Sequence, residues 1–83
     1  MAYYIDTIEQ IKGEEEGTYT EYGKREKKGT YQEALTAFYT KLTNVSNSDS
    51  HVWLDIKIVN SEGGCEKKDS IGKYYEHVPT VEK

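Results

Sequence analysis

The chain has 83 residues, so we expect a single small domain over 1–83. Acidic residues outnumber basic residues by 15 to 11, and this balance argues against nonspecific nucleic-acid binding, which needs clustered positive charge. Eight tyrosines, one tryptophan and one phenylalanine supply much of the 35% hydrophobic content. Tyrosine tolerates a half-exposed position, so we expect a thin core and some aromatic surface.

Negative charge is concentrated near the N-terminus. Residues 1–22 contain six acidic residues and one basic residue, whereas residues 23–83 contain nine acidic and ten basic residues. An acidic element can steer a protein toward a basic partner surface. The alternative is a solvated hairpin without a partner.

The chain contains one cysteine, Cys65, so no intrachain disulfide can form. Small secreted domains usually need disulfides, and we therefore expect a reducing, cytoplasmic location. No apolar run resembles a signal peptide or approaches the 18 apolar residues of a membrane span. We expect Cys65 itself to be a half-buried small hydrophobe beside a turn.

Residues 2–12 fit either a strand or a helix. Ile5, Ile8 and Ile11 recur every third residue, which suits a helix, whereas the density of Tyr, Ile and Thr suits a strand. We favour a strand because residues 18–25 have the composition of its hairpin partner, across a glycine-flanked turn. A strand places Ile8 on the opposite face from the other two isoleucines, unless a bulge resets the alternation.

Residues 30–46 give the clearest helical pattern. Thr30 and Glu33 form a capping box, in which each side chain accepts a hydrogen bond from the backbone N–H of the other residue. The apolar side chains that follow recur at steps of four and three, and so share one face. They are Tyr31, Leu35, Phe38, Leu42 and Val45. The residues expected to point outward are Thr36, Thr40, Lys41 and Thr43.

Residues 51–60 alternate between apolar and other side chains, which is typical of a half-buried strand. The apolar row is Val52, Leu54, Ile56 and Ile58. We expect this row to face the apolar stripe of the helix. Trp53 falls on the other face, so it is exposed if the helix covers only one side of the sheet.

The last part of the chain predicts a second hairpin. Residues 61–64 form its turn. Residues 65–78 form a weaker strand, in which Gly72 and its neighbours mark a bulge or a break. Two of its side chains are expected to point inward: Ile71 and Tyr75. We expect residues 79–83 to be a flexible tail.

The element order is strand, strand, helix, strand, strand. It predicts an α+β fold, a two-layer sandwich with a four-stranded antiparallel sheet and one amphipathic helix, about 30–46, across one face. The order of the strands within the sheet is left open by the sequence.

Candidate catalytic and metal-binding residues are few. His51 and His77 can approach each other across the last hairpin, but Cys65 lies at its opposite end, and this distance argues against a cysteine–histidine nucleophile pair. Neither the histidines and cysteine nor the run Glu14–Glu16 has the spacing of a zinc or calcium site. We therefore predict no catalytic residues, no metal and no cofactor, and a protein that is not an enzyme.

We predict a small, acidic protein-binding module. Its partner-binding residues are predicted to be Glu9, Glu14, Glu15, Glu16, Glu21, Trp53 and Asp55. The acidic hairpin would steer association and the aromatic side chains would anchor it. In size, acidity and tyrosine content the chain is similar to small acidic α+β proteins of bacteriophages and mobile elements. This similarity implies an accessory protein that binds and inhibits a larger host protein of defence or nucleic-acid handling.

Two alternatives stay open. The first is a single-stranded nucleic-acid or nucleotide binder that uses Trp53 and the tyrosines for stacking. Its basic residues would be Lys24, Arg25, Lys27, Lys28, Lys67 and Lys68. The second is a structural homo-oligomer in which a sheet edge or the Trp53 face is buried between copies. The acidic balance makes nucleic acid the less favoured partner, and no membrane partner is expected.

Overall fold

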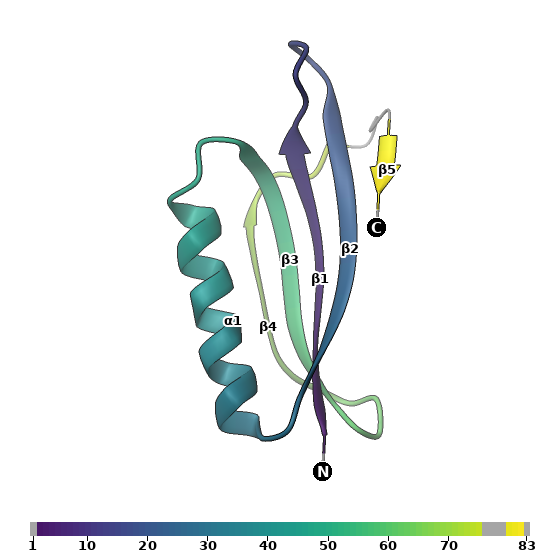
Figure 1. Cartoon of the computed structure of the whole chain (residues 1–83), viewed down its shortest axis with the longest axis vertical. Helices are drawn as coiled ribbons and strands as arrows, with labels where there is room; N and C mark the ends of the chain where they lie inside the picture. Colours follow the sequence, from purple (N-terminus) through teal and green to yellow (C-terminus); the bar gives the residue numbers. More distant parts are fainter. Residues whose placement is uncertain (1, 76–79, 83) are drawn as a thin grey trace.

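The computed structural model describes residues 2–75 and 80–82. It consists of one sheet and one helix on one face of that sheet (Figure 1). The elements are β1 (Tyr3–Lys12), β2 (Tyr19–Lys28), α1 (Tyr31–Ser46), β3 (His51–Asn60), β4 (Cys65–Gly72) and β5 (Thr80–Glu82). The predicted four-stranded antiparallel sheet, crossed by one amphipathic helix, is confirmed, and β5 adds a short fifth strand.

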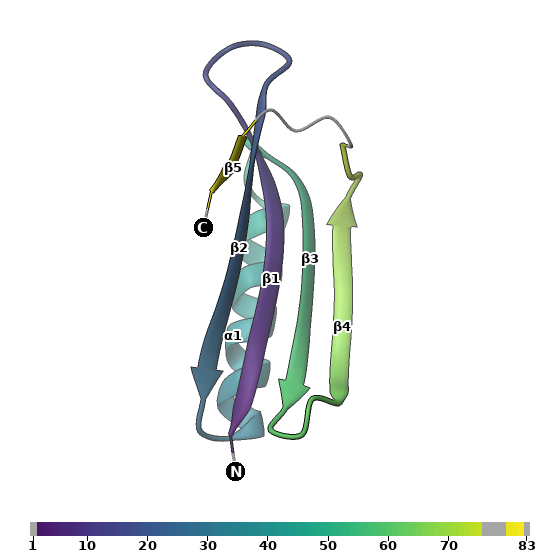
Figure 2. The ribbon, with the colours of Figure 1, turned by 90° about the vertical axis from the view of Figure 1, so that its right-hand side faces the viewer.

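The strands lie in the order β4-β3-β1-β2-β5. Strands β1 to β4 pair antiparallel with their neighbours, whereas β5 pairs parallel with β2 over Thr20–Tyr22 (Figure 2). Strand β1 is central, which settles the ambiguity of residues 2–12 in favour of a strand. Residues 80–82, predicted as part of a flexible tail, form β5, and residues 79 and 83 lie outside the described residues.

Two strand boundaries differ from the prediction. Strand β2 extends three residues beyond the predicted end, because residues 26–28 pair with residues 3–5 of β1. Strand β4 ends at Gly72 rather than at residue 78. The backbone of Gly72 has φ +83°, and a Cβ at this position would clash with the carbonyl oxygen of Val52. Only glycine adopts this turn without strain, so the chain leaves the sheet there.

The helix begins as its capping box predicts. The Thr30 hydroxyl accepts a hydrogen bond from the Glu33 N–H at 3.1 Å. The Glu33 carboxylate accepts from the N–H of Gly29 at 3.1 Å, rather than from that of Thr30. Both bonds satisfy backbone donors that have no partner within the helix.

The core lies between α1 and the face of the sheet that it covers, here called the inner face. Alternate residues of β1 and β3 meet there in register: Ile5 with Ile58, Thr7 with Ile56, and Glu9 with Leu54. The helix contributes Ala34, Phe38 and Val45, and the flanking side chains of the predicted stripe are partly buried. The opposite face is here called the outer face. It includes Ile8, which is 41% exposed as the alternation predicts.

Candidate protein-binding site

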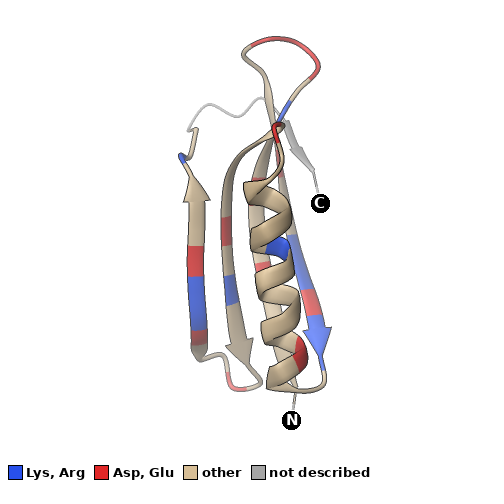
Figure 3. Ribbon diagram, turned by 90° about the vertical axis from the view of Figure 1, so that its left-hand side faces the viewer, with Lys and Arg blue, Asp and Glu red and all other residues tan. Residues whose placement is uncertain are grey.

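The turn between β1 and β2 carries three exposed carboxylates, Glu14, Glu15 and Glu16, here called the acidic tip. The hairpin projects beyond the end of α1, and its turn carries the acidic run (Figures 2 and 3). Its backbone is held by hydrogen bonds from the Gly13 N–H to the Thr18 carbonyl at 2.7 Å and from the Thr18 hydroxyl to the Glu15 carbonyl. In the described part of the chain, no cation forms an ion pair with these carboxylates.

The other two acidic residues of the predicted site lie elsewhere. Glu21 is half-buried on the outer face and accepts a hydrogen bond from the Gln10 amide at 3.1 Å. Glu9 is buried on the inner face, so its predicted place in an exposed acidic hairpin is wrong. The cause is strand alternation, since Glu9 has the same parity as Ile5 and therefore points toward α1.

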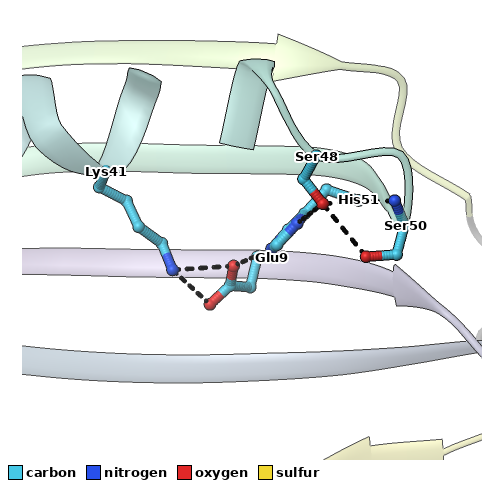
Figure 4. Close-up of polar contacts among 5 residues, drawn as sticks. All are labelled: Glu9, Lys41, Ser48, Ser50 and His51. Atoms are coloured by element: carbon cyan, nitrogen blue, oxygen red, sulfur yellow. Dashed lines mark hydrogen bonds and ion pairs between the residues drawn. The ribbon is translucent and has the colours of Figure 1, made fainter. Parts of the chain in front are cut away.

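The carboxylate of Glu9 contacts two basic side chains (Figure 4). The Lys41 Nζ lies 3.0 and 3.1 Å from its two carboxylate oxygens, and the His51 Nε2 lies 2.7 Å from Oε1. Lys41 was predicted to point outward from the helix, and that prediction is wrong. The buried carboxylate on the central strand β1 holds the lysine toward the sheet, because burying the carboxylate without a partner would be costly.

The network continues into the loop after α1. The His51 Nδ1 lies 2.9 Å from the Ser48 hydroxyl, which lies 3.1 Å from the Ser50 hydroxyl (Figure 4). A serine, a histidine and a carboxylate in series resemble a hydrolytic triad. Here, however, Lys41 compensates the carboxylate, Ser48 also contacts Ser50, and neither Ser48 nor His51 lines any of the principal grooves of the described surface. We therefore interpret this network as a structural one that holds β1, α1 and β3 together.

Four aromatic side chains on the outer face form the aromatic patch: Tyr19, Trp53, Tyr74 and Tyr75. The Tyr19 and Tyr75 rings stack with centroids 4.4 Å apart, and the Trp53 and Tyr74 rings meet edge-to-face at 4.8 Å. Trp53 therefore lies on the predicted face, but it is half-buried beneath Tyr74. Tyr75, predicted to point inward, is 43% exposed because the chain has already left the sheet at Gly72.

The segment 73–75 is held across the outer face by Gln10. This side chain is completely buried, and its amide donates to the Tyr75 carbonyl at 2.8 Å and accepts from the Tyr75 N–H at 2.9 Å. The amide thus pairs with the backbone of Tyr75 as a neighbouring strand would. Nothing in the local sequence distinguishes Gln10 from an ordinary polar strand residue, so no local pattern predicts this contact.

Asp55, the last of the predicted residues, is exposed on the outer face two positions from Trp53. Further along the same face, Arg25 donates two hydrogen bonds to Asp6, both of 2.6 Å. This bidentate contact lowers the pKa of the Asp6 carboxyl below its usual value. The outer face therefore carries charge in addition to its aromatic patch.

Three comparisons with known proteins give no match. No family model, no curated protein and no solved structure matches this chain. The candidate site therefore rests on its residues and geometry.

Other classes of site find little support in the described residues. No group of three or more His, Cys, Asp or Glu side chains is arranged there to hold a metal ion. No helix among them has the length and apolar character needed to cross a bilayer. Cys65 is exposed rather than half-buried. His77 lies outside the described residues, so its predicted approach to His51 stays a prediction.

Proposed function

We propose that this protein is a non-enzymatic binding module that contacts a basic surface of a partner protein. The main support for this proposal is the arrangement of charge at the acidic tip. Its three carboxylates are adjacent, exposed and without ion pairs in the described residues, at one end of a molecule 43 Å long. Clustered charge of one sign steers association and raises the association rate constant.

The aromatic patch supports the same proposal, because it lies at the same end of the sheet as the acidic tip. Tyr19 pairs with Lys12, the last residue of β1 before the turn, and Trp53 pairs with Gln10. Tyr74 and Tyr75 are 45% and 43% exposed. Large aromatic side chains at a half-exposed position are frequent anchors of protein interfaces. The proposed interface thus combines charge at the tip with aromatic area beside it.

The proposed contact residues are fewer than the sequence suggested. Glu9 and Glu21 are left out because each is already engaged in a buried or half-buried contact. Asp55 is kept as a peripheral charge beside Trp53.

The partner that we propose is a host protein that handles nucleic acid. Surfaces that bind phosphate carry clustered lysine and arginine. Three adjacent carboxylates present such a surface with negative charge comparable to that of the phosphate groups of a nucleic acid. An accessory protein of this kind would act as an inhibitor by occupying that surface. A reducing, cytoplasmic setting belongs to the proposal, since the exposed thiol of Cys65 is free.

Affinity purification from the native host tests the proposal. The bait is the wild-type chain, a tip variant with Glu14→Lys, Glu15→Lys and Glu16→Lys, or a control variant with Glu62→Lys and Glu66→Lys in the opposite hairpin. We expect wild type and control to capture the same basic partner, and the tip variant to lose it. Capture of every partner by the tip variant, at wild-type yield, would remove the acidic tip from the proposal.

A further inference from the structure

The helix leaves the inner face of β2 uncovered. Lys24 and Glu26, which alternate onto this face of β2, are exposed, whereas β3 contributes three completely buried side chains to the core. A groove of about 650 Å³ lies between β2 and α1. It is lined by Glu26 and Lys28 of β2 and by Gln32, Thr36 and Thr40 of α1, among others. Two further hollows, at Lys24 and Gly23, continue this groove along β2 toward the hairpin.

The same part of β2 is a free sheet edge. Strand β5 pairs with β2 only over Thr20–Tyr22, and in the described residues no strand pairs with Gly23–Lys28 on that side. An edge strand presents unpaired backbone N–H and C=O groups, which form a template for another strand. Six residues of strand span about 20 Å, which is enough for a short extended peptide. The pairing of β5 shows that this edge accepts a parallel strand.

The free edge is basic, although the whole chain is acidic. Residues 23–28 contain four basic residues and one acidic residue, and Figure 3 shows this charge beside α1. Arg25 is paired with Asp6, and Lys28 lies 3.7 Å from Glu26. Lys24 and Lys27 form no ion pair within the described residues. Two uncompensated lysines therefore favour an occupant that carries negative charge.

We propose that the edge Gly23–Lys28, with the groove between β2 and α1, binds an extended acidic segment of a partner protein by strand addition in line with β5. Backbone hydrogen bonds supply the contact along the edge, and alternate side chains of the segment enter the groove. A peptide is favoured over a nucleic acid because only a peptide backbone matches a row of alternating N–H and C=O groups. This site is separate from the acidic tip and aromatic patch. A result that contradicts one of these two proposed sites does not contradict the other.

The test uses an octapeptide of alternating glutamate and threonine as its probe, titrated into the full chain and followed by two-dimensional NMR. We expect the largest shifts, and slowed amide exchange, within Gly23–Lys28. The double variant Lys24→Glu, Lys27→Glu should bind about tenfold more weakly, because it reverses the charge of both uncompensated lysines. The matched control Lys68→Glu, Lys73→Glu and the tip variant should bind as wild type does.

Two further probes separate strand addition from charge attraction. A peptide of the same sequence with alternate amides N-methylated keeps its charge but loses its backbone donors, and we expect it not to bind. Equal binding of the methylated peptide, shifts confined to other strands, or no binding of the unmodified peptide would overturn the proposal. Tighter binding of an oligothymidylate at the same edge would also overturn it, in favour of a nucleic-acid site.

Discussion

Gln10 joins three segments of the outer face: β1, β2 and residues 73–75. Its buried amide bonds both backbone groups of Tyr75 and also Glu21. We predict that Gln10→Leu lowers the free energy of unfolding by about 1–3 kcal/mol, because it leaves these groups without partners. Urea denaturation measures the change, and Gln32→Leu on the exposed side of α1 is the control. A loss no larger than that of the control would show that the hydrogen bonds of Gln10 contribute nothing to stability.

The ion pair of Asp6 with Arg25 makes the stability of the fold depend on pH. Arginine holds the folded-state pKa of Asp6 below the ordinary value of 3.8, so the stabilisation is present above that value and is lost as the pH falls through the lowered pKa. Both side chains are partly exposed, so solvent screening limits the effect to less than about 1 kcal/mol.

Asp6→Asn should therefore unfold more easily than wild type at neutral pH, and the difference should shrink as the pH falls below 3.8 and through the lowered pKa of Asp6. Urea midpoints measured across this range test the prediction. A difference that grows as the pH falls would contradict it.

At the scale of elements, Gly72 sets the end of β4 and the path of the chain across the outer face. We predict that Gly72→Ala destabilises the fold by about 1–3 kcal/mol, since it combines a positive φ with a clash against Val52. Gly23→Ala is the matched control in β2, where a Cβ meets nothing within 4 Å, and its cost should stay within about 0.5 kcal/mol of zero. Similar thermal midpoints for the two variants would refute this role of Gly72.

Local patterns predicted most of these elements. The capping box and the apolar stripe gave α1, and the alternation of residues 51–60 gave β3. The end of β2 was missed because residues 26–28 are charged and have poor strand propensity. Pairing with the first residues of β1 overrides that local preference.

The contacts of the candidate site are harder to predict from the sequence than the helix and strands are. Gln10 and Tyr75 are 65 positions apart, and Glu9 and Lys41 are 32 apart, so no local pattern connects them. The burial of Glu9 could have been inferred, because it shares the parity of Ile5 in a strand. The exposure of the acidic tip followed directly from three adjacent like charges in a glycine-flanked turn.

At the scale of the whole molecule, charge and shape divide the protein into two surfaces. The acidic tip and aromatic patch lie at one end, and the basic edge of β2 lies farther along the sheet (Figure 3). The acidic excess of residues 1–22 is thus concentrated at one end, while residues 23–83 are close to neutral. Such a separation lets one small sheet present surfaces of opposite charge.

The association rate constant with the partner captured from the native host measures how much the acidic tip contributes to binding. At about 50 mM salt, the tip variant should associate at least about tenfold more slowly than wild type. The difference between the two rate constants should be smaller at about 500 mM salt, because exposed charges are then screened. The control variant with Glu62→Lys and Glu66→Lys should associate as wild type does. Equal association rate constants for wild type and tip variant at low salt would contradict the proposed role of the acidic tip.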